Sequence, residues 1–353
     1  MKKSIFKRSI AGMLAFAFLL TTMVSVGGTT AFAAGTQEKV YIVSFPRSGD
    51  VSSNNGWGHS AQTYLNGWST TANSYTITRA IGGYEGQACY CIEPGVSQQT
   101  GDSLTKKDEN FWDNYPDDYN DAISPYTIKL FIGRIMQYGY TGNISTSWRS
   151  NNSGADNLCN LIATQILIWE SVIGERDDNF NKLSTGSKNA ALDQIATHPL
   201  KSKIMSHYNR IAESVRTHST IPSFMKMSEG SASSYEMSWN GSQYVLELTD
   251  TNNVLSGCSF SSSDSSMKFS VSGNKLKITS TTAPSGSVTI TASKKNAQRM
   301  GVITWSDGNV GPRGGKQDIV SYSQPVSDQV YGFAKIKVSF GSAKSSRQAR
   351  TAT

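Results

Sequence analysis

The sequence is poor in the residues from which proteins build metal sites and disulfide frameworks. It contains four cysteines and four histidines in 353 residues. The cysteines form no CxxC pair and the histidines show no HExxH or other paired-ligand spacing, so the sequence predicts neither a metal site nor a cofactor. Four cysteines are also too few for a disulfide-rich scaffold in a chain of this length. The histidines are His59, His198, His207 and His218.

Long hydrophobic runs are also missing, apart from one near the N-terminus. Residues 1–34 begin with MKKSIFKRSI, continue with AGMLAFAFLL and end with AFAA. This order of basic, apolar and small residues is typical of a cleaved secretory signal peptide, and the apolar run is too short and wrongly flanked for a membrane span. We therefore expect an exported chain that starts near Ala34 or Gly35 and does not insert into a membrane.

The body of the chain has no excess of one charge. The formal net charge is +7, but residues 1–34 hold four basic residues and residues 341–353 hold three, and neither segment has an acid. The 26 basic residues that remain in 35–340 are matched by all 26 acidic ones. Without a basic surface, nucleic acid is not an expected partner. Residues 341–353 lack large apolar side chains and are expected to form a disordered basic tail.

The first part of the mature chain, residues 35–222, combines strands and helices. Residues 40–92 contain short runs such as VYIVSF and YTITRAI between Gly, Ser and Asn clusters, a pattern typical of strands and turns. Farther along, apolar residues recur at helical spacing. The predicted helices cover about 125–138, 154–175, 187–196 and 199–217. In the second of these, Asp156 or Asn157 can cap the start and Gly174 can end the helix.

The second part, residues 223–340, changes in composition after Ile221-Pro222. Runs such as YVLELTD, KLKITS and SVTITAS alternate apolar and polar residues and are separated by Gly, Asn and Ser turns. This pattern predicts an antiparallel β-sandwich. The predicted fold class is therefore α+β: a β-rich domain with an inserted helical subdomain at 35–222, followed by a sandwich domain at 223–340.

Gln165 stands out because it lies in the apolar stripe of the 154–175 helix. A buried amide must form hydrogen bonds, or it costs free energy. Two interpretations are open. In the first, the amide binds the backbone of the preceding sheet, which is the usual fate of a buried glutamine. In the second, a cysteine thiol has displaced the amide nitrogen as ammonia and has left a thioester.

Two short motifs favour the second interpretation. Tyr90 and Cys91 lie in the strand-like segment CYCIEPG, and the sequence TQILIW at Thr164–Trp169 lies on the helix. An aromatic residue before a strand cysteine, together with a TQxxxW-type helix, resembles the thioester domains of surface adhesins from Gram-positive bacteria. This resemblance implies that Cys91 and Gln165 form the bond, in a helical subdomain that carries the glutamine. It extends across most of residues 38–340.

The resemblance also implies a function. A thioester is an activated acyl group with a good leaving group, so the lysine amine of a host or extracellular-matrix protein can attack it without ATP. Tyr90, Thr164, Ile168 and Trp169 are expected to line or shield the carbonyl. Because nothing regenerates the bond, the sequence predicts a single-use covalent adhesin and no enzyme. No LPxTG-type motif or closing anchor is found, so we expect either a longer cell-wall protein or a released product.

The other cysteines leave alternatives open. Cys89 is a second candidate thiol, but Tyr90 precedes Cys91 as the family pattern requires, whereas Ala88 precedes Cys89. Cys159 lies six residues before the glutamine, which turns it away from the stripe, so a disulfide between Cys89 and Cys159 stays possible. Cys258 is expected to be a small buried residue in the sandwich.

Two other functions fit parts of the sequence. A cysteine protease would use Cys91 as its nucleophile and His198 or His207 as its base. It predicts a cysteine at the head of a helix, whereas Cys91 lies in a strand-like segment. A non-covalent glycan- or protein-binding module would use aromatic side chains that more often pack in the core. Those aromatics are Trp57, Trp68, Trp112, Tyr138 and Tyr140.

Alternating strand lysines are a further feature of the second part. Lys268, Lys275 and Lys277 lie on predicted strands and could supply an intramolecular isopeptide bond. A solvent-facing position is their default interpretation.

Overall fold

The computed structural model describes residues 35–46, 74–115, 120–145, 152–183, 190–196, 200–308 and 315–338, with gaps at 82, 84, 94–95, 97, 121, 285 and 296. Met1–Ala31 and Phe32–Thr353 form separate units, and every described residue belongs to the second. The predicted signal peptide at 1–34 and the predicted tail at 341–353 lie outside the described residues. None of the described helices has the length and apolar character that crossing a membrane requires.

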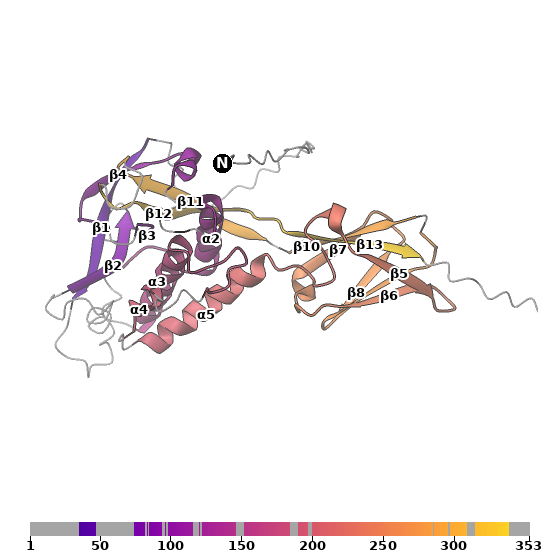
Figure 1. The fold of residues 1–353 in the computed structure, drawn as a ribbon. Helices are drawn as coiled ribbons and strands as arrows, with labels where there is room; N and C mark the ends of the chain where they lie inside the picture. The colour runs from indigo at the N-terminus through magenta and orange to yellow at the C-terminus, as the bar shows by residue number, and fades with distance from the viewer. Residues whose placement is uncertain are drawn as a thin grey trace, which may run out of the picture. The chain divides into compact units, whose positions relative to one another are not determined.

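The described chain alternates between strand-rich and helix-rich stretches (Figure 1). In chain order the elements are β1 (Gln37–Pro46), β2 (Ser74–Ile81), β3 (Gln87–Cys91), β4 (Asp102–Lys106), the 3-10 helix η2 (Glu109–Asp113), α2 (Pro125–Tyr138), α3 (Asn152–Val172), α4 (Ala190–Asp193), α5 (Lys201–His218), η5 (Glu229–Ser231), β5 (Ser234–Trp239), β6 (Tyr244–Thr249), η6 (Leu255–Gly257), β7 (Cys258–Ser262), β8 (Lys268–Ser272), β9 (Lys275–Ser280), β10 (Val288–Lys294), β11 (Gln298–Ser306), β12 (Ile319–Ser327) and β13 (Tyr331–Val338).

Six antiparallel strands close into a barrel in the order β1-β2-β3-β12-β11-β4. Its interior is a cluster to which all six strands contribute, and we call this cluster the barrel core. The members are Val40, Ile81, Cys89, Leu104, Ile303, Trp305 and Ile319. In β3 the register places Ala88 opposite Ala80 and Cys91 opposite Ile319. The barrel therefore fixes β3 between β2 and β12.

The helices pack around α3, and this second cluster is the helical core. Every residue of α3 from Leu161 to Ile168 is buried, so the helix is enclosed on all sides along this stretch. Ala88, Tyr90 and Ile92 also belong to the helical core. Since neighbouring residues of a strand face opposite sides, β3 presents alternate side chains to the helices and to the barrel interior.

The remaining strands form a seven-stranded sheet in the order β7-β10-β13-β5-β6-β9-β8. Burial alternates along β9, where Leu276 and Ile278 are buried and Lys275 and Lys277 are exposed. The exposed position expected for these lysines is therefore observed. The rings of Phe260 and Phe269 on the two edge strands lie 6.1 Å apart, so the sheet curls until its edges approach each other.

Two features of this topology correct the sequence prediction. β11 and β12 lie in the barrel and not in the sheet that follows residue 222. The seven-stranded sheet is not wholly antiparallel, because β13 pairs in parallel with β5. The physical reason is that alternation identifies a strand with one buried face but carries no information about which sheet it joins.

The helix bounds agree with the sequence in part. α2 covers the predicted residues, and its N-cap Ser124 accepts from the N–H of Thr127. Gly174 ends α3 with a φ of 75°, which favours glycine. However, α3 starts at Asn152, before the predicted caps. Asp156 instead accepts from Nε2 of His207 at 3.0 Å, so this side chain ties α3 to α5.

Candidate functional site

The structure brings Cys91 and Gln165 together. The backbone N–H of Cys91 donates to Oε1 of Gln165 at 2.8 Å, and Nε2 of Gln165 donates to the carbonyl oxygen of Cys91 at 3.0 Å. Both residues have an exposed fraction of 0%. The N–H needs an acceptor and the carbonyl needs a donor, so only this orientation of the amide satisfies both. The side-chain carbonyl of the glutamine therefore lies against the residue that carries the candidate thiol.

The architecture of the sheet explains why an amide fits at this point. Pairing between β2 and β3 ends at Arg79 and Cys89, two residues before Cys91. On the opposite side of β3, Tyr90 and Cys91 pair with Val320 and Ile319 of β12. A buried backbone N–H and carbonyl without partners would cost free energy. β2 itself runs back to Ser74 alongside β1, but it no longer pairs with β3. The amide of Gln165 supplies the hydrogen bonds that continued pairing with β2 would have given.

The residues that precede Cys91 and Gln165 are connected through Tyr140. The hydroxyl of Tyr90 donates to the carbonyl oxygen of Tyr140 at 2.6 Å, and the N–H of Tyr140 donates to Oγ1 of Thr164 at 2.9 Å. Burial raises the pKa of Tyr90 well above its ordinary value, so the phenol stays protonated and can donate. The backbone of Tyr140 thus links β3 to α3 beside the Cys91–Gln165 contact.

The side chain of Thr164 approaches the backbone of Tyr140 so closely that the preceding residue, Gly139, must be a glycine. A Cβ on Gly139 would lie 2.4 Å from Oγ1 of Thr164 and 2.8 Å from the carbonyl oxygen of Ile135. Both distances are shorter than van der Waals contact. Gly139 therefore allows the chain to leave α2 against the side of α3.

Replacing Thr164 by valine tests this link. Valine keeps the shape of threonine but leaves the N–H of Tyr140 without its acceptor. We expect the free energy of unfolding to fall by about 1–3 kcal/mol in urea titrations. Thr127 offers a matched control, because its hydroxyl contacts the exposed hydroxyl of Ser124, and Thr127→Val should cost less than about 0.5 kcal/mol. Equal losses in the two variants would contradict the role given to Thr164.

The other predicted site residues surround Gln165 within α3. Ile168 has no exposed surface, and Ile92 is equally buried on the β3 side. Trp169 is partly exposed and packs against the helical core, and in the part of the chain that the structure describes its buried Nε1 has no hydrogen-bond partner. Gln165 itself has no exposed surface.

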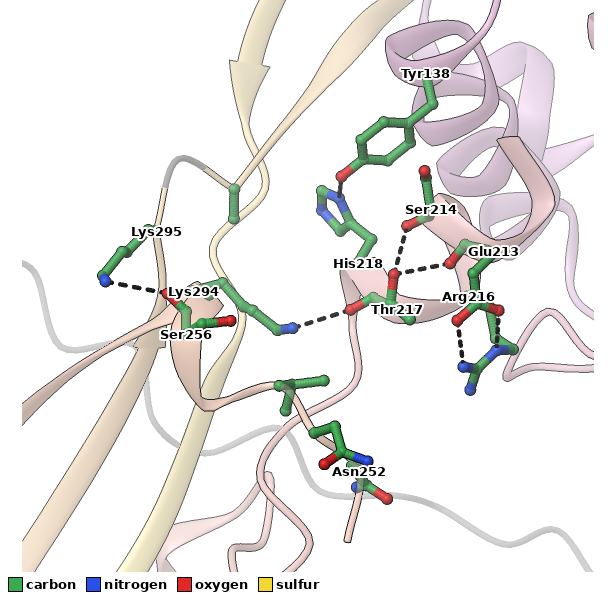
Figure 2. Close-up of a pocket in the computed structure, with 14 residues that line it drawn as sticks. Tyr138, Glu213, Ser214, Arg216, Thr217, His218, Asn252, Ser256, Lys294 and Lys295 are labelled. Carbon is green, nitrogen blue, oxygen red and sulfur yellow. Dashed lines mark hydrogen bonds and ion pairs between the residues drawn. The ribbon is translucent and has the colours of Figure 1, made fainter. Parts of the chain in front are cut away.

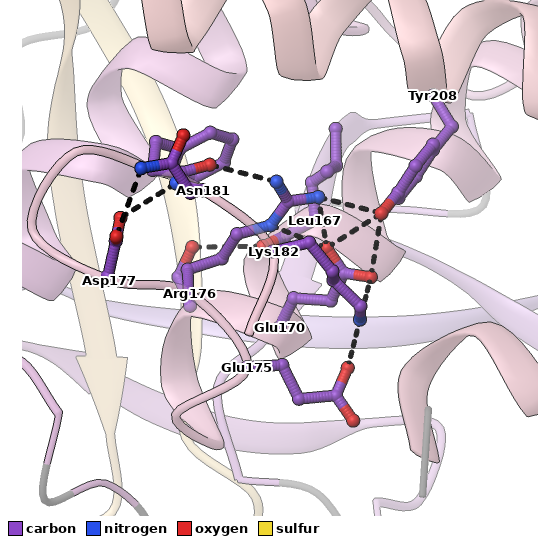
Figure 3. Close-up of polar contacts among 10 residues, drawn as sticks. Leu167, Glu170, Glu175, Arg176, Asp177, Asn181, Lys182 and Tyr208 are labelled. Atoms are coloured by element: carbon purple, nitrogen blue, oxygen red, sulfur yellow. Dashed lines mark hydrogen bonds and ion pairs between the residues drawn. The ribbon is translucent and has the colours of Figure 1, made fainter. Parts of the chain in front are cut away.

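A buried ion network fixes the end of α3 (Figure 3). The carboxylate of Glu170 accepts from Nε and Nη2 of Arg176 at 2.8 and 2.6 Å, and from the hydroxyl of Tyr208 at 2.9 Å. Nζ of Lys182 joins Glu170 to Glu175. Glu170 has an exposed fraction of 0%. The network therefore ties α3 to the 175–183 loop and to α5, five residues beyond Gln165.

Comparison with known proteins agrees with the paired motifs. Residues 88–217 match a family model that is described as the thioester domain. The resemblance to thioester domains is confirmed. Both motifs lie inside the matched residues, which we call the thioester-domain segment. No curated protein matches the chain.

Two solved structures are similar to this chain. The first is the thioester domain of the Staphylococcus aureus TIE protein, with 17% identity, a TM-score of 0.40, and coverage of 86% of this chain and 99% of that chain. The second is the Bacillus anthracis TIE protein, with 11% identity, a TM-score of 0.30, and coverage of 86% of this chain and 49% of that chain.

The remaining cysteines occupy different surroundings. Cys89 lies in the barrel core, whereas Cys159 lies in the helical core of the thioester-domain segment. No disulfide joins any of the four cysteines, all of which are described. Burial raises the pKa of the Cys159 thiol to about 12, so it is protonated at neutral pH. Cys258 is a buried member of the core of the seven-stranded sheet.

The residues of the two competing functions are scattered: Tyr140 lies beside the Cys91–Gln165 contact and Tyr138 lines a separate cavity, while others are buried, lie near the surface or fall outside the described residues. His207 pairs with Asp156 near the surface, while Cys91 is fully buried. Trp112 is 1% exposed and belongs to the helical core, so it does not line a groove. His59, His198, Trp57 and Trp68 lie outside the described residues. Over the described ranges, no group of three or more His, Cys, Asp or Glu side chains is placed to hold a metal ion.

A cavity of about 630 Å³ lies at the C-terminal end of α5 (Figure 2). Its polar groups are largely engaged with one another. Nζ of Lys294 donates to the carbonyl oxygen of Thr217 at 3.0 Å, and His218 contacts the hydroxyl of Tyr138 at 2.8 Å. Lysine at this position satisfies an open carbonyl of the last helical turn. The cavity contains neither of the two motifs.

Proposed function

We propose that this chain is an exported, cell-surface adhesin that attaches to its target through a thioester between Cys91 and Gln165. The observation that carries the proposal is the pair of hydrogen bonds between the backbone of Cys91 and the side-chain amide of Gln165. A satisfied buried glutamine alone would be an ordinary structural feature. Its partner is the cysteine of the strand motif within a thioester-domain segment, and that combination favours the covalent interpretation.

Formation of the bond exchanges one leaving group for another. The Cys91 sulfur attacks Cδ of Gln165 and forms a tetrahedral intermediate, and the C–N bond then breaks. The nitrogen leaves as ammonia after it gains the proton that the thiol has lost. The N–H of Cys91 already lies 2.8 Å from Oε1, within the range in which a donor stabilises a developing oxyanion. No cofactor or nucleotide is needed.

Capture of a target reverses the roles of sulfur and nitrogen. A neutral amine attacks the same carbonyl carbon, the C–S bond breaks, and the amine proton ends on the Cys91 sulfur. The product is an amide between Gln165 and the target, together with a free thiol. Amides hydrolyse far more slowly than thioesters, so attachment is permanent and each molecule acts once. We therefore class the chain as a single-use linker and not as an enzyme.

The target class follows from this chemistry. Lysine is the abundant source of primary amines on protein surfaces, so a host or extracellular-matrix protein that presents a lysine is the proposed partner. Cys91 and Gln165 are fully buried, which protects the carbonyl from water. A target amine must therefore reach it by a local opening, and docking of a partner can supply the free energy for that opening.

A labelled amine tests the proposal. Purified protein is incubated with biotin-cadaverine, boiled in SDS, and probed for biotin. We expect label that survives denaturation, that peptide mapping assigns to Gln165, and that prior treatment with methylamine prevents. The same assay with a lysine-rich protein, with and without acetylated lysines, tests capture of a protein target. A protein that binds its target but takes up no biotin label would be a non-covalent module.

A further inference from the structure

Two buried carboxyl groups, those of Glu93 and Asp318, lie where β3 ends and β12 begins, close along the chain to Cys91 and to its strand partner Ile319. Glu93 is two residues after Cys91, just beyond the end of β3. Its exposed fraction is 1%, as is that of Asp318. The backbone N–H of Asp318 donates to Oε2 of Glu93 at 2.7 Å. The carbonyl oxygen of Asp318 accepts from the N–H of Ile92 at 3.1 Å. The start of β12 therefore holds Glu93 next to the end of β3.

Glu93 keeps one carboxyl oxygen uncommitted. Its Oε1 is buried and has no hydrogen-bond partner among the described residues. A buried acceptor with no partner costs free energy, so a carboxyl group used only to stabilise the fold would be expected to have both oxygens bonded. Its backbone carbonyl, by contrast, is satisfied by Nε2 of Gln317 at 3.1 Å. The arrangement leaves Oε1 available to take or give a proton.

The surroundings raise the pKa of both carboxyl groups into the neutral range. Burial raises the pKa of Glu93 to about 7, against the lowering effect of the hydrogen bond from Asp318. The charge of Asp307 raises it further. Burial also raises the pKa of Asp318 to about 8, with Ser306 and Lys107 acting in the opposite direction. A carboxyl group that titrates near the working pH can act both as base and as acid.

We propose that Glu93 carries the proton between sulfur and nitrogen at the Cys91–Gln165 site, held in position by the backbone N–H of Asp318. The inference rests on the function proposed above and adds a residue to it. The signal in the sequence is a glutamate directly after the apolar residue that follows Cys91, which by itself looks like an ordinary turn residue.

The proton balance closes in both directions. During formation, ionised Glu93 accepts the thiol proton while sulfur attacks Cδ, and then donates it to the departing nitrogen, which leaves as ammonia. During capture, Glu93 accepts a proton from the attacking amine and donates it to the departing Cys91 sulfur. In each direction Glu93 ends in the state in which it began. No oxidant, metal or other reactant is required.

Glu93→Gln is the direct test, because it keeps the shape of the side chain and removes its ability to accept a proton. Release of the Cys91 thiol by methylamine is followed between pH 5 and 9, and rates are expressed per free-base amine. For the wild type we expect the rate constant to rise as pH passes through about 7, where Glu93 ionises. In Glu93→Gln this rise should vanish, and the rate above pH 7 should fall by about 100-fold. Glu247→Gln is the control, because Glu247 forms an exposed ion pair with Lys275.

If Glu93→Gln forms no thioester, its reaction with methylamine cannot be followed, and Glu93→Asp then provides the test. It restores a carboxyl group, so a larger fraction of Glu93→Asp than of Glu93→Gln should lack one ammonia in intact mass. Circular dichroism of each variant shows that it is folded. The inference is overturned if folded Glu93→Gln keeps the wild-type rate and pH profile, or if Glu93→Asp is no better than Glu93→Gln. If the wild type itself retains its ammonia, the proposed function fails first, so the two failures are distinguishable.

Discussion

Replacing Cys91 by alanine should abolish covalent capture of amines, whereas replacing Cys89 by alanine should leave it intact. The side-chain amide of Gln165 accepts a hydrogen bond from the backbone N–H of Cys91 and donates one to its carbonyl oxygen. Cys89, one pleat earlier, pairs with Arg79 of β2 and belongs to the barrel core. An acyl group cannot form without its sulfur, so uptake of biotin-cadaverine by Cys91→Ala should fall by at least about 100-fold.

Gln165→Ala gives a second arm of this experiment. It removes the acyl carbon and should be as inactive as Cys91→Ala. Both variants also lose part of a buried contact, so urea unfolding shows whether each protein is folded when it is assayed. If Cys89→Ala lost labelling and Cys91→Ala kept it, the thioester would be formed by Cys89 and not by Cys91. Labelling that persists in Gln165→Ala would place the acyl group elsewhere.

Replacing Glu170 by alanine should produce the largest loss of stability. Glu170 is fully buried and binds Arg176, Lys182 and Tyr208. Its removal leaves the guanidinium of Arg176, which is itself 4% exposed, without its carboxylate. Breaking a buried ion pair from one side costs about 3–5 kcal/mol, because the remaining charge stays desolvated. Because α3 also carries Gln165, we expect slower thioester formation in the same variant.

Glu247→Ala is the matched control for this prediction. Glu247 pairs with Lys275 on the exposed side of the seven-stranded sheet, and exposed pairs contribute about 0–1 kcal/mol. Urea titration of both variants gives the comparison. A loss below about 1 kcal/mol in Glu170→Ala would mean that the network does not stabilise α3 in the way its geometry indicates.

Local patterns predicted the helices better than the arrangement of the strands. α2 covers the predicted residues because Ser124, Pro125 and a helical apolar period all indicate the same start. The barrel could not be predicted, since β11 and β12 return to β3 and β4 after the whole helical region and six further strands. The alternation of apolar and polar residues indicates that a strand has one buried face, but it does not indicate which strands pair with it.

The contact between Cys91 and Gln165 could be anticipated, but its supports could not. The two motifs pointed to both residues, and an amide within the apolar stripe of a helix needs a partner. Tyr140 links the two motifs through its backbone, which any residue type could supply, so this role could not be predicted from its side chain. In the sequence Glu93 follows a predicted strand and has the character of a polar turn residue. Its burial depends on packing against Asp318, which is distant in the sequence.

Intact mass of the purified wild-type protein tests the central claim most directly. A thioester between Cys91 and Gln165 predicts a mass lower than that of the mature sequence by one ammonia. Treatment with methylamine should then add the full mass of methylamine and expose one new thiol. A wild-type mass equal to that of the mature sequence, unchanged by methylamine, would contradict the account and leave Gln165 as a structural amide.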